Sequence, residues 1–173
     1  GYLIGSTGEQ RLYRLTDDYL KIDSTFRSVV LSNNHREAPC LRKHDGWYYL
    51  FTSESQGWYP SQGAYQSSKT IKGLAKSKLI PIGNRATFGA QSGQVQKIGN
   101  NYCMMANRWS QGWSTSLDTS SGKEFENFLG TSGIRFAQRM LPITMKDGYA
   151  YYDYYHKIKY DWNTGTVIPV QNG

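Results

Sequence analysis

Residues 36–53 read REAPCLRKHDGWYYLFTS, and this stretch decides the fold. The Asp45-Gly46 pair favours a tight hairpin turn, because Gly after Asp supplies the positive φ that such a turn requires. The unbroken apolar run over residues 47–51 is typical of a strand buried on both faces. Pro39 cannot donate a ladder hydrogen bond, so Glu37 is expected where the first strand begins. A carboxylate at the rim of a sheet suits a catalytic acid.

The composition also favours an all-β protein. At 173 residues the chain is long enough for one domain with a substantial core. Aromatic residues make up 14% of it, with 14 Tyr and 5 Trp, and these residues favour strands. The 18 Gly supply turns, whereas the long runs of Glu, Lys and Ala found in helical proteins are missing.

Charge and cysteine content argue against several classes of function. The net charge of +7 is spread along the chain without a dense basic run, so we expect a solvated basic surface and no nucleic-acid partner. No apolar run approaches the length of a membrane span. The histidines are scattered and Cys40 and Cys103 lack metal-ligand spacing, so we expect no cofactor, with a structural calcium left open. The two cysteines are expected as a disulfide or as buried free thiols.

A turn followed by an apolar strand recurs along the chain. The turns fall at Gly1, Gly46, Gly99 and Gly148. A repeat of about 50 residues with a hairpin in each unit is typical of a β-propeller, whose blades are four-stranded antiparallel sheets. In the first unit, residues 19–22 are expected as the outer strand.

The length of this repeat leaves the propeller incomplete. The chain holds about three and a half units, whereas a closed propeller needs about four to eight blades. An open row of sheets would expose edge strands, which soluble proteins avoid. Residues 1–173 are therefore expected to be the C-terminal portion of a single β-propeller domain, with the N-terminal blades on another chain or on a cleaved segment.

Glu37 and Gln91 are the first candidates for chemistry. Gln91 precedes its hairpin much as Glu37 precedes the hairpin before it. The first strand of each blade lines the central channel of a propeller, so both side chains are expected to face one axial pocket. The alternative for Glu37 is a solvated carboxylate at a strand end, and for Gln91 it is a structural hydrogen bond to a loop.

Further polar and aromatic residues are expected to shape a binding site. Trp58 stands on a loop, where an exposed Trp face stacks on sugar rings, although packing over the core is the alternative. Arg108 suits hydroxyl or carboxylate ligands, with a structural ion pair as the alternative. The remaining candidates are Gln56, Trp109, Asp153 and Tyr155.

Several of these segments resemble glycoside hydrolase family 43. The family resemblance is carried by Glu37-Ala38-Pro39, residues 46–50, Thr52-Ser53 and Gly57-Trp58. A resemblance to its exo-β-1,3-galactanase branch is carried by residues 87–92, Asn107-Arg108-Trp109 and residues 141–143. The resemblance covers nearly the whole chain, with residues 110–134 divergent. It implies an all-β five-bladed β-propeller, of which this chain supplies roughly the last three to three and a half blades.

The resemblance also implies roles for the candidates. Glu37 matches the general acid of the family, and Gln91 matches the residue that positions or activates water in the galactanase branch, through its imidic acid tautomer. Hydrolysis in this family inverts the anomeric carbon. The Asp that serves most members as base and the Asp that tunes the acid would both lie before Gly1. The branch usually has Asp at the position of Asn107, and an amide is intrinsically a poor base.

Together these features predict an inverting, exo-acting glycoside hydrolase that releases galactose from β-1,3-linked galactan, the backbone of arabinogalactan. Such a polysaccharide-degrading enzyme is expected to be secreted or periplasmic. Its expected partners are the polysaccharide or oligosaccharide substrate and the N-terminal segment of the same propeller as a second chain. The alternatives are another family 43 specificity, such as α-L-arabinofuranosidase or β-xylosidase, and a non-catalytic carbohydrate-binding propeller.

Overall fold

The structure, a computed structural model, describes residues 1–6, 8–57, 61–109, 136–155 and 157–170, without the side chains of residues 108, 109, 136 and 137. The divergent region 110–134 lies outside the described residues. Within them the chain is built from antiparallel strands and two short 3-10 helices, which confirms the all-β prediction. No helix among these residues is long and apolar enough to cross a membrane.

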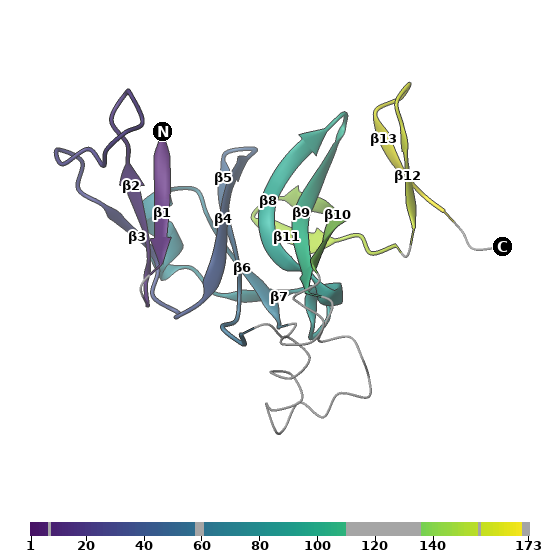
Figure 1. Cartoon of the computed structure of the whole chain (residues 1–173), viewed down its shortest axis with the longest axis horizontal. Coiled ribbons are helices and arrows are strands. Elements are labelled where there is room, and N and C mark those ends of the chain that lie inside the picture. Colours follow the sequence, from purple (N-terminus) through teal and green to yellow (C-terminus); the bar gives the residue numbers. More distant parts are fainter. Residues whose placement is uncertain (7, 58–60, 110–135, 156, 171–173) are drawn as a thin grey trace.

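The strands form four sheets that stand side by side in chain order (Figure 1). The first sheet has the order β1 (Tyr2–Ser6), β2 (Gln10–Arg14) and β3 (Val29–Ser32). The second has the order β4 (Glu37–His44), β5 (Trp47–Ser53), β6 (Gly63–Ser68) and β7 (Ile80–Ile82). The third has the order β11 (Tyr149–Tyr152), β10 (Phe136–Lys146), β9 (Asn101–Trp109) and β8 (Gln91–Ile98). The last pairs β12 (Ile158–Asp161) with β13 (Thr166–Pro169).

The two 3-10 helices connect strands at the edges of these sheets. Helix η1 (Ile71–Lys76) lies between β6 and β7, and helix η2 (Thr87–Gly89) leads into β8. The second and third sheets are therefore four-stranded antiparallel meanders, the form that the repeat predicts for a propeller blade.

Two strand assignments made from the sequence are wrong. The hairpin at Gly148 joins β10 to β11 inside the third sheet, so it does not begin a fourth unit. Residues 19–22 form no strand beyond one isolated bridge, and the third strand of the first sheet is β3. The physical reason for the first error is that Asp147-Gly148 has the same turn chemistry as Asp45-Gly46, and a turn does not reveal which sheet its strands join.

Strand β5 is buried on both faces, as its unbroken apolar run predicts. Tyr49 and Phe51 point into the core between the second and third sheets, where they pack with Met104 and neighbouring side chains. Leu50, which alternates with them, points into a second core shared with the first sheet, where it packs with Leu12 and neighbouring leucines. A strand placed between two cores cannot carry the polar alternation of a half-exposed strand.

Both cysteines are buried free thiols, which settles the choice left open by the sequence. Burial raises the pKa of Cys103 to about 11, so its thiol stays protonated at neutral pH. The sulfur of Cys40 accepts a hydrogen bond from the backbone N–H of Val95 at 3.3 Å. This bond joins β4 to β8, the two strands that begin with the catalytic candidates.

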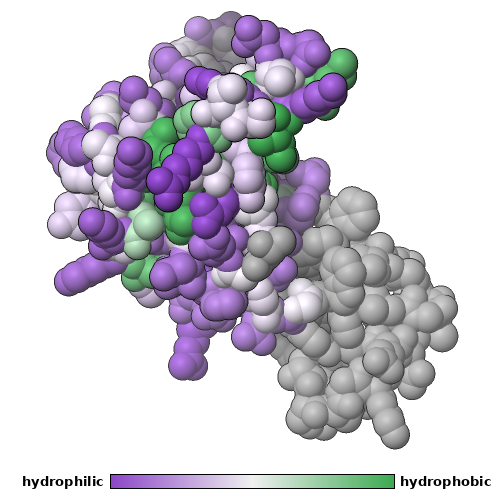
Figure 2. Space-filling view, turned by 90° about the vertical axis from the view of Figure 1, so that its left-hand side faces the viewer, coloured by the Kyte–Doolittle hydropathy of each residue, from purple (hydrophilic) through white to green (hydrophobic). Residues whose placement is uncertain are grey.

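Large apolar side chains are exposed in the first sheet and its β2–β3 connection, and in the last two sheets and the β12–β13 turn. Near the chain's start they are Tyr2, Leu3, Tyr19, Leu20 and Ile22. Figure 2 looks onto this side of the molecule and shows apolar groups in green among hydrophilic ones in purple. At the other end they are Tyr149, Tyr151, Trp162 and Ile168. Apolar surface at both ends of a row of sheets is typical of a face that another element covers.

The two Asp-Gly turns offer a test of the packing between sheets. Gly148 has φ 85°, and a Cβ added there would lie 2.7 Å from Cζ3 of Trp47, whereas a Cβ at Gly46, with φ 73°, meets nothing closer than 4.0 Å. We expect Gly46→Ala to lower the free energy of unfolding by about 1–2 kcal/mol through backbone strain alone. Gly148→Ala should cost about 1–3 kcal/mol more because it also overpacks the sheet interface. Urea denaturation of both variants measures the difference, and equal losses would contradict it.

Candidate active site

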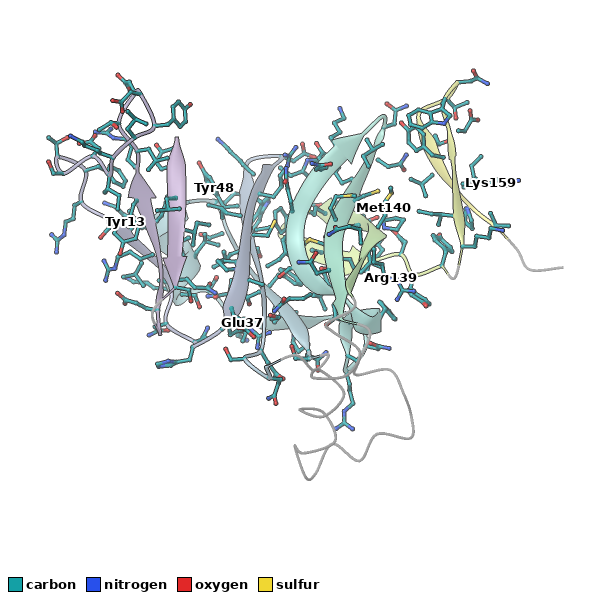
Figure 3. All side chains as sticks on the ribbon, in the orientation of Figure 1. Tyr13, Glu37, Tyr48, Arg139, Met140 and Lys159 are labelled. Carbon is teal, nitrogen blue, oxygen red and sulfur yellow. The ribbon has the colours of Figure 1, made fainter. Side chains whose placement is uncertain are left out.

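Glu37 is the first residue of β4, where Pro39 predicts the strand to begin. Its side chain is partly exposed, at the lower end of the strand in Figure 3. Ala38 has a left-handed backbone with φ 51°, and the pairing of β4 with β5 shifts register between Glu37 and Cys40. A bulge of this kind at the start of a strand redirects the side chains beside it. The local sequence therefore places a carboxylate on the rim of the sheet.

Gln91 takes the equivalent place in the third sheet. It is the first residue of β8, and the pairing of β8 with β9 shifts register between Gln91 and Gln94, as it does after Glu37. Gln91 lies opposite Asn107 in its ladder, and Glu37 lies opposite Ser53 in the ladder of the second sheet. The structure thus repeats one strand beginning, bulge included, in two adjacent sheets.

A serine hydroxyl links these two strand beginnings. The Nε2 of Gln91 donates a hydrogen bond to Oγ of Ser53 at 3.1 Å, and that hydroxyl donates to the backbone carbonyl of Glu37 at 3.5 Å. Next to it, the hydroxyl of Ser92 donates to the backbone carbonyl of Ala38 at 2.7 Å. The beginnings of β4 and β8 are therefore linked through Ser53 and Ser92. That the side chains of Glu37 and Gln91 face one axial pocket stays a prediction.

The polar groups continue across the third sheet. Asn107 of β9 lies between Gln91 of β8 and Gln138 of β10, and the Nε2 of Gln138 donates to Oδ1 of Asn107 at 2.8 Å. Directly opposed residues of an antiparallel sheet are close neighbours, so the row supplies amide donors and acceptors suited to sugar hydroxyls. Nothing in the local sequence around Gln138 indicates this place, because the pairing of β9 with β10 is long-range.

Arg36 holds the beginning of β4 from inside the protein. Its Nε donates to Oγ1 of Thr52 at 2.8 Å, and its Nη2 donates to the carbonyls of Thr52 at 3.3 Å and Gln62 at 2.6 Å. Burial lowers the pKa of Arg36 from its usual range, and the charge of Glu54, 3.9 Å away, opposes that shift. The guanidinium nevertheless remains charged at any physiological pH.

The backbone carbonyl of Arg36 accepts hydrogen bonds from the first sheet. It accepts hydrogen bonds from Oγ of Ser6 at 3.2 Å and from Nε2 of Gln10 at 3.0 Å, both in the first sheet. The residue before Glu37 is therefore tied to two sheets at once.

An aromatic and cationic cluster holds the approach to Gln91. Thr87 and Phe88 have left-handed backbones, with φ 49° and 53°, and the Nη1 of Arg139 donates to the carbonyl of Phe88. The ring of Tyr154 stacks on Phe88, with centroids 4.2 Å apart, and Arg139 lies 5.4 Å from the Tyr154 ring centroid. The chain after β11 is thereby packed against the loop that precedes Gln91. Tyr155, a predicted site residue, follows Tyr154 there and is 40% exposed.

Asp153 is not placed beside Glu37. Its Oδ2 accepts a hydrogen bond from Oγ1 of Thr144 at 3.1 Å, and it lines a pocket of about 300 Å³ together with His44 and Tyr102. Because His44 ends the strand that Glu37 begins, this pocket reaches the opposite end of β4. The role of Asp153 in a sugar subsite stays a prediction.

The remaining sequence candidates are only partly described. Gln56 is exposed on the loop that follows β5, and Trp58 on the same loop lies outside the described residues. Arg108 and Trp109 end β9 directly after Asn107, but their side chains also lie outside the description. Across the described ranges no three His, Cys, Asp or Glu side chains gather as they would to hold a metal ion.

Comparison with known proteins gives matches among solved structures. No protein-family model matches the chain, and no curated protein does. An exo-β-1,3-galactanase from Clostridium thermocellum is 28% identical, with a TM-score of 0.77, over 98% of this chain and 35% of its own. A Phanerochaete chrysosporium exo-β-1,3-galactanase in complex with β-1,3-galactotriose is 20% identical, with a TM-score of 0.72, over 98% of this chain and 36% of its own.

A third similar structure is a family 43 β-1,3-galactosidase in complex with galactodeoxynojirimycin. It is 22% identical, with a TM-score of 0.65, over 90% of this chain and 42% of its own. The chain thus spans between 35% and 42% of the length of these three structures. These similarities confirm the resemblance to the exo-β-1,3-galactanases of glycoside hydrolase family 43.

Proposed function

We propose that the chain is the C-terminal portion of a five-bladed propeller domain of an inverting, exo-acting glycoside hydrolase that releases galactose from β-1,3-linked galactan. The observation that carries this proposal is the placement of Glu37 and Gln91 at equivalent strand beginnings of adjacent sheets, joined through Ser53. The 28% identity to an exo-β-1,3-galactanase over 98% of the chain supports the specificity.

In the proposed reaction Glu37 is the general acid and Gln91 positions the attacking water. Glu37 donates its proton to the glycosidic oxygen as the bond from that oxygen to the anomeric carbon breaks. The water forms the new bond from the opposite face of the sugar, and its surplus proton returns to solvent, from which Glu37 is protonated again. One water is consumed in each turnover, and a β-linkage yields α-galactose first.

We also propose that further propeller sheets, on a second chain or segment, complete the site. Two observations support this: the exposed apolar side chains at both ends of the row, and a first sheet of three described strands beside sheets of four. A polysaccharide substrate places such an enzyme outside the cytoplasm, secreted or periplasmic. Mass spectrometry of the natively purified protein tests the partner, since a second polypeptide of about two blades should accompany the chain.

A substrate panel tests the reaction. The natively purified protein should release galactose from β-1,3-galactan, and proton NMR should show the α-anomer before mutarotation. Release of arabinose or xylose from arabinan or xylan in its place would favour another family 43 specificity. Binding of β-1,3-galactobiose in calorimetry without any sugar release would favour a non-catalytic carbohydrate-binding propeller.

A further inference from the structure

We propose that Ser53 is a positioning residue that fixes the orientation of the Gln91 amide relative to Glu37; this inference rests on the proposed function. Ser53 is only 2% exposed and stands at the end of β5, opposite Glu37 in the ladder. Its single hydroxyl accepts from Nε2 of Gln91 at 3.1 Å and donates to the carbonyl of Glu37 at 3.5 Å. One oxygen therefore links the side-chain amide of Gln91 to the backbone at Glu37.

The hydrogen bond decides which end of the Gln91 amide faces Ser53. The amide nitrogen can only donate, whereas the amide oxygen can only accept. Because both atoms branch from the same carbon, holding Nε2 at Ser53 turns Oε1 away from it. Only the oxygen end of the amide can accept a hydrogen bond from a water molecule, so the orientation set by Ser53 is the one that lets Gln91 align an attacking water.

Ser53 is itself held in place by a buried network. The preceding residue, Thr52, receives hydrogen bonds from Arg36 at both its hydroxyl and its carbonyl. The bulge beside Glu37 is held by the bond from Ser92 to the carbonyl of Ala38. The hydroxyl of Ser53 thus sits on a rigid support, which is what a residue needs to hold a catalytic group to within a fraction of an ångström.

A purely structural role is the competing explanation, and the chain supplies a matched control. The hydroxyl of Ser67, in β6, also bonds across two sheets, donating to the carbonyl of Gly148 at 2.6 Å. Ser67 lies away from Glu37 and Gln91 and has no part in the proposed site. Loss of either hydroxyl removes one hydrogen bond between the second and third sheets. Ser53→Ala also removes the longer bond to the carbonyl of Glu37, which lies within the second sheet.

The test is a kinetic comparison of Ser53→Ala and Ser67→Ala in the natively assembled protein, with β-1,3-galactan as substrate. Ser53→Ala should lower kcat by about 10- to 100-fold, because a small misplacement of a catalytic group has effects of that size. The Kd for β-1,3-galactobiose should stay within about twofold, since binding groups are untouched. Ser67→Ala should retain wild-type kcat.

A double variant separates positioning from general weakening. In a Gln91→Ala background, Ser53→Ala should cause no further loss of kcat, because its effect passes through the missing amide. A wild-type kcat in Ser53→Ala, or independent losses that multiply in the double variant, would overturn the inference. Failure of the proposed function has a different signature, since Glu37→Gln would then retain wild-type galactose release or the wild-type protein would release none.

Discussion

Glu37→Gln is expected to lower kcat on β-1,3-galactan by about 10²- to 10⁴-fold, the contribution typical of a positioned general acid. The substitution keeps the shape of the side chain and its place at the start of β4, but an amide has no proton of suitable acidity to give. The Kd for β-1,3-galactobiose should change little, because the variant removes an interaction made in the transition state.

A comparison of substrates with different leaving groups tests whether Glu37 acts as the acid. The leaving group of an aryl β-galactoside with an acidic phenol can depart as phenolate without being protonated. Glu37→Gln should therefore slow the hydrolysis of such a galactoside far less than the hydrolysis of galactan. A matched control is Glu9→Gln, since Glu9 pairs with Arg11 in the first sheet and is not part of the proposed site. Equal losses on both substrates would show that Glu37 does not act as the acid. Wild-type turnover on galactan would refute its catalytic role altogether.

The sequence predicts the hairpins better than it predicts their grouping into sheets. Asp45-Gly46 and Asp147-Gly148 both form the turns that their chemistry requires, with positive φ at all four residues. The buried strand β5 follows from its apolar run. The sheet to which a hairpin belongs depends on long-range pairing, so the turn at Gly148 was assigned to the wrong unit.

The outer strand of the first sheet was missed for a related reason. Residues 19–22 carry three large apolar or aromatic side chains, yet Tyr19, Leu20 and Ile22 are exposed, and β3 follows them in the chain. A short edge strand such as Val29–Ser32 has too few residues to show a periodicity of its own. Burial against η1 and the second sheet, which a sequence window does not contain, decides its place.

The positions of Glu37 and Gln91 at the strand beginnings could be predicted from the sequence. Pro39 limits where β4 can begin, which puts Glu37 on the rim, and the repeat then points to Gln91 at the same place in the next unit. Gln138 and Tyr154 join their neighbours only through sheet register and ring stacking between distant segments. No local pattern encodes such contacts.

Replacing Arg36 should have a large effect on stability. Arg36→Met keeps most of the aliphatic volume but removes the hydrogen bonds that the guanidinium donates to the hydroxyl and carbonyl of Thr52 and to the carbonyl of Gln62. We expect the free energy of unfolding to fall by about 2–4 kcal/mol, the size typical of a broken buried network. The stability of Arg36→Lys should lie between that of the wild-type protein and that of Arg36→Met. An ammonium group cannot reproduce the planar fork whose Nε reaches the Thr52 hydroxyl while Nη2 reaches both carbonyls.

A comparison with Glu54→Gln shows which interaction of Arg36 matters. The carboxylate of Glu54 is 43% exposed and 3.9 Å from the guanidinium, so water screens the pair and its removal should cost no more than about 1 kcal/mol. Urea denaturation of the three variants measures this order, and a loss in Glu54→Gln equal to that in Arg36→Met would assign the stability to the ion pair. Otherwise the stability comes from hydrogen bonds to Thr52 and Gln62, which also hold the residue that precedes Glu37. Arg36→Met should then lower stability and also disturb the position of Glu37, the proposed general acid.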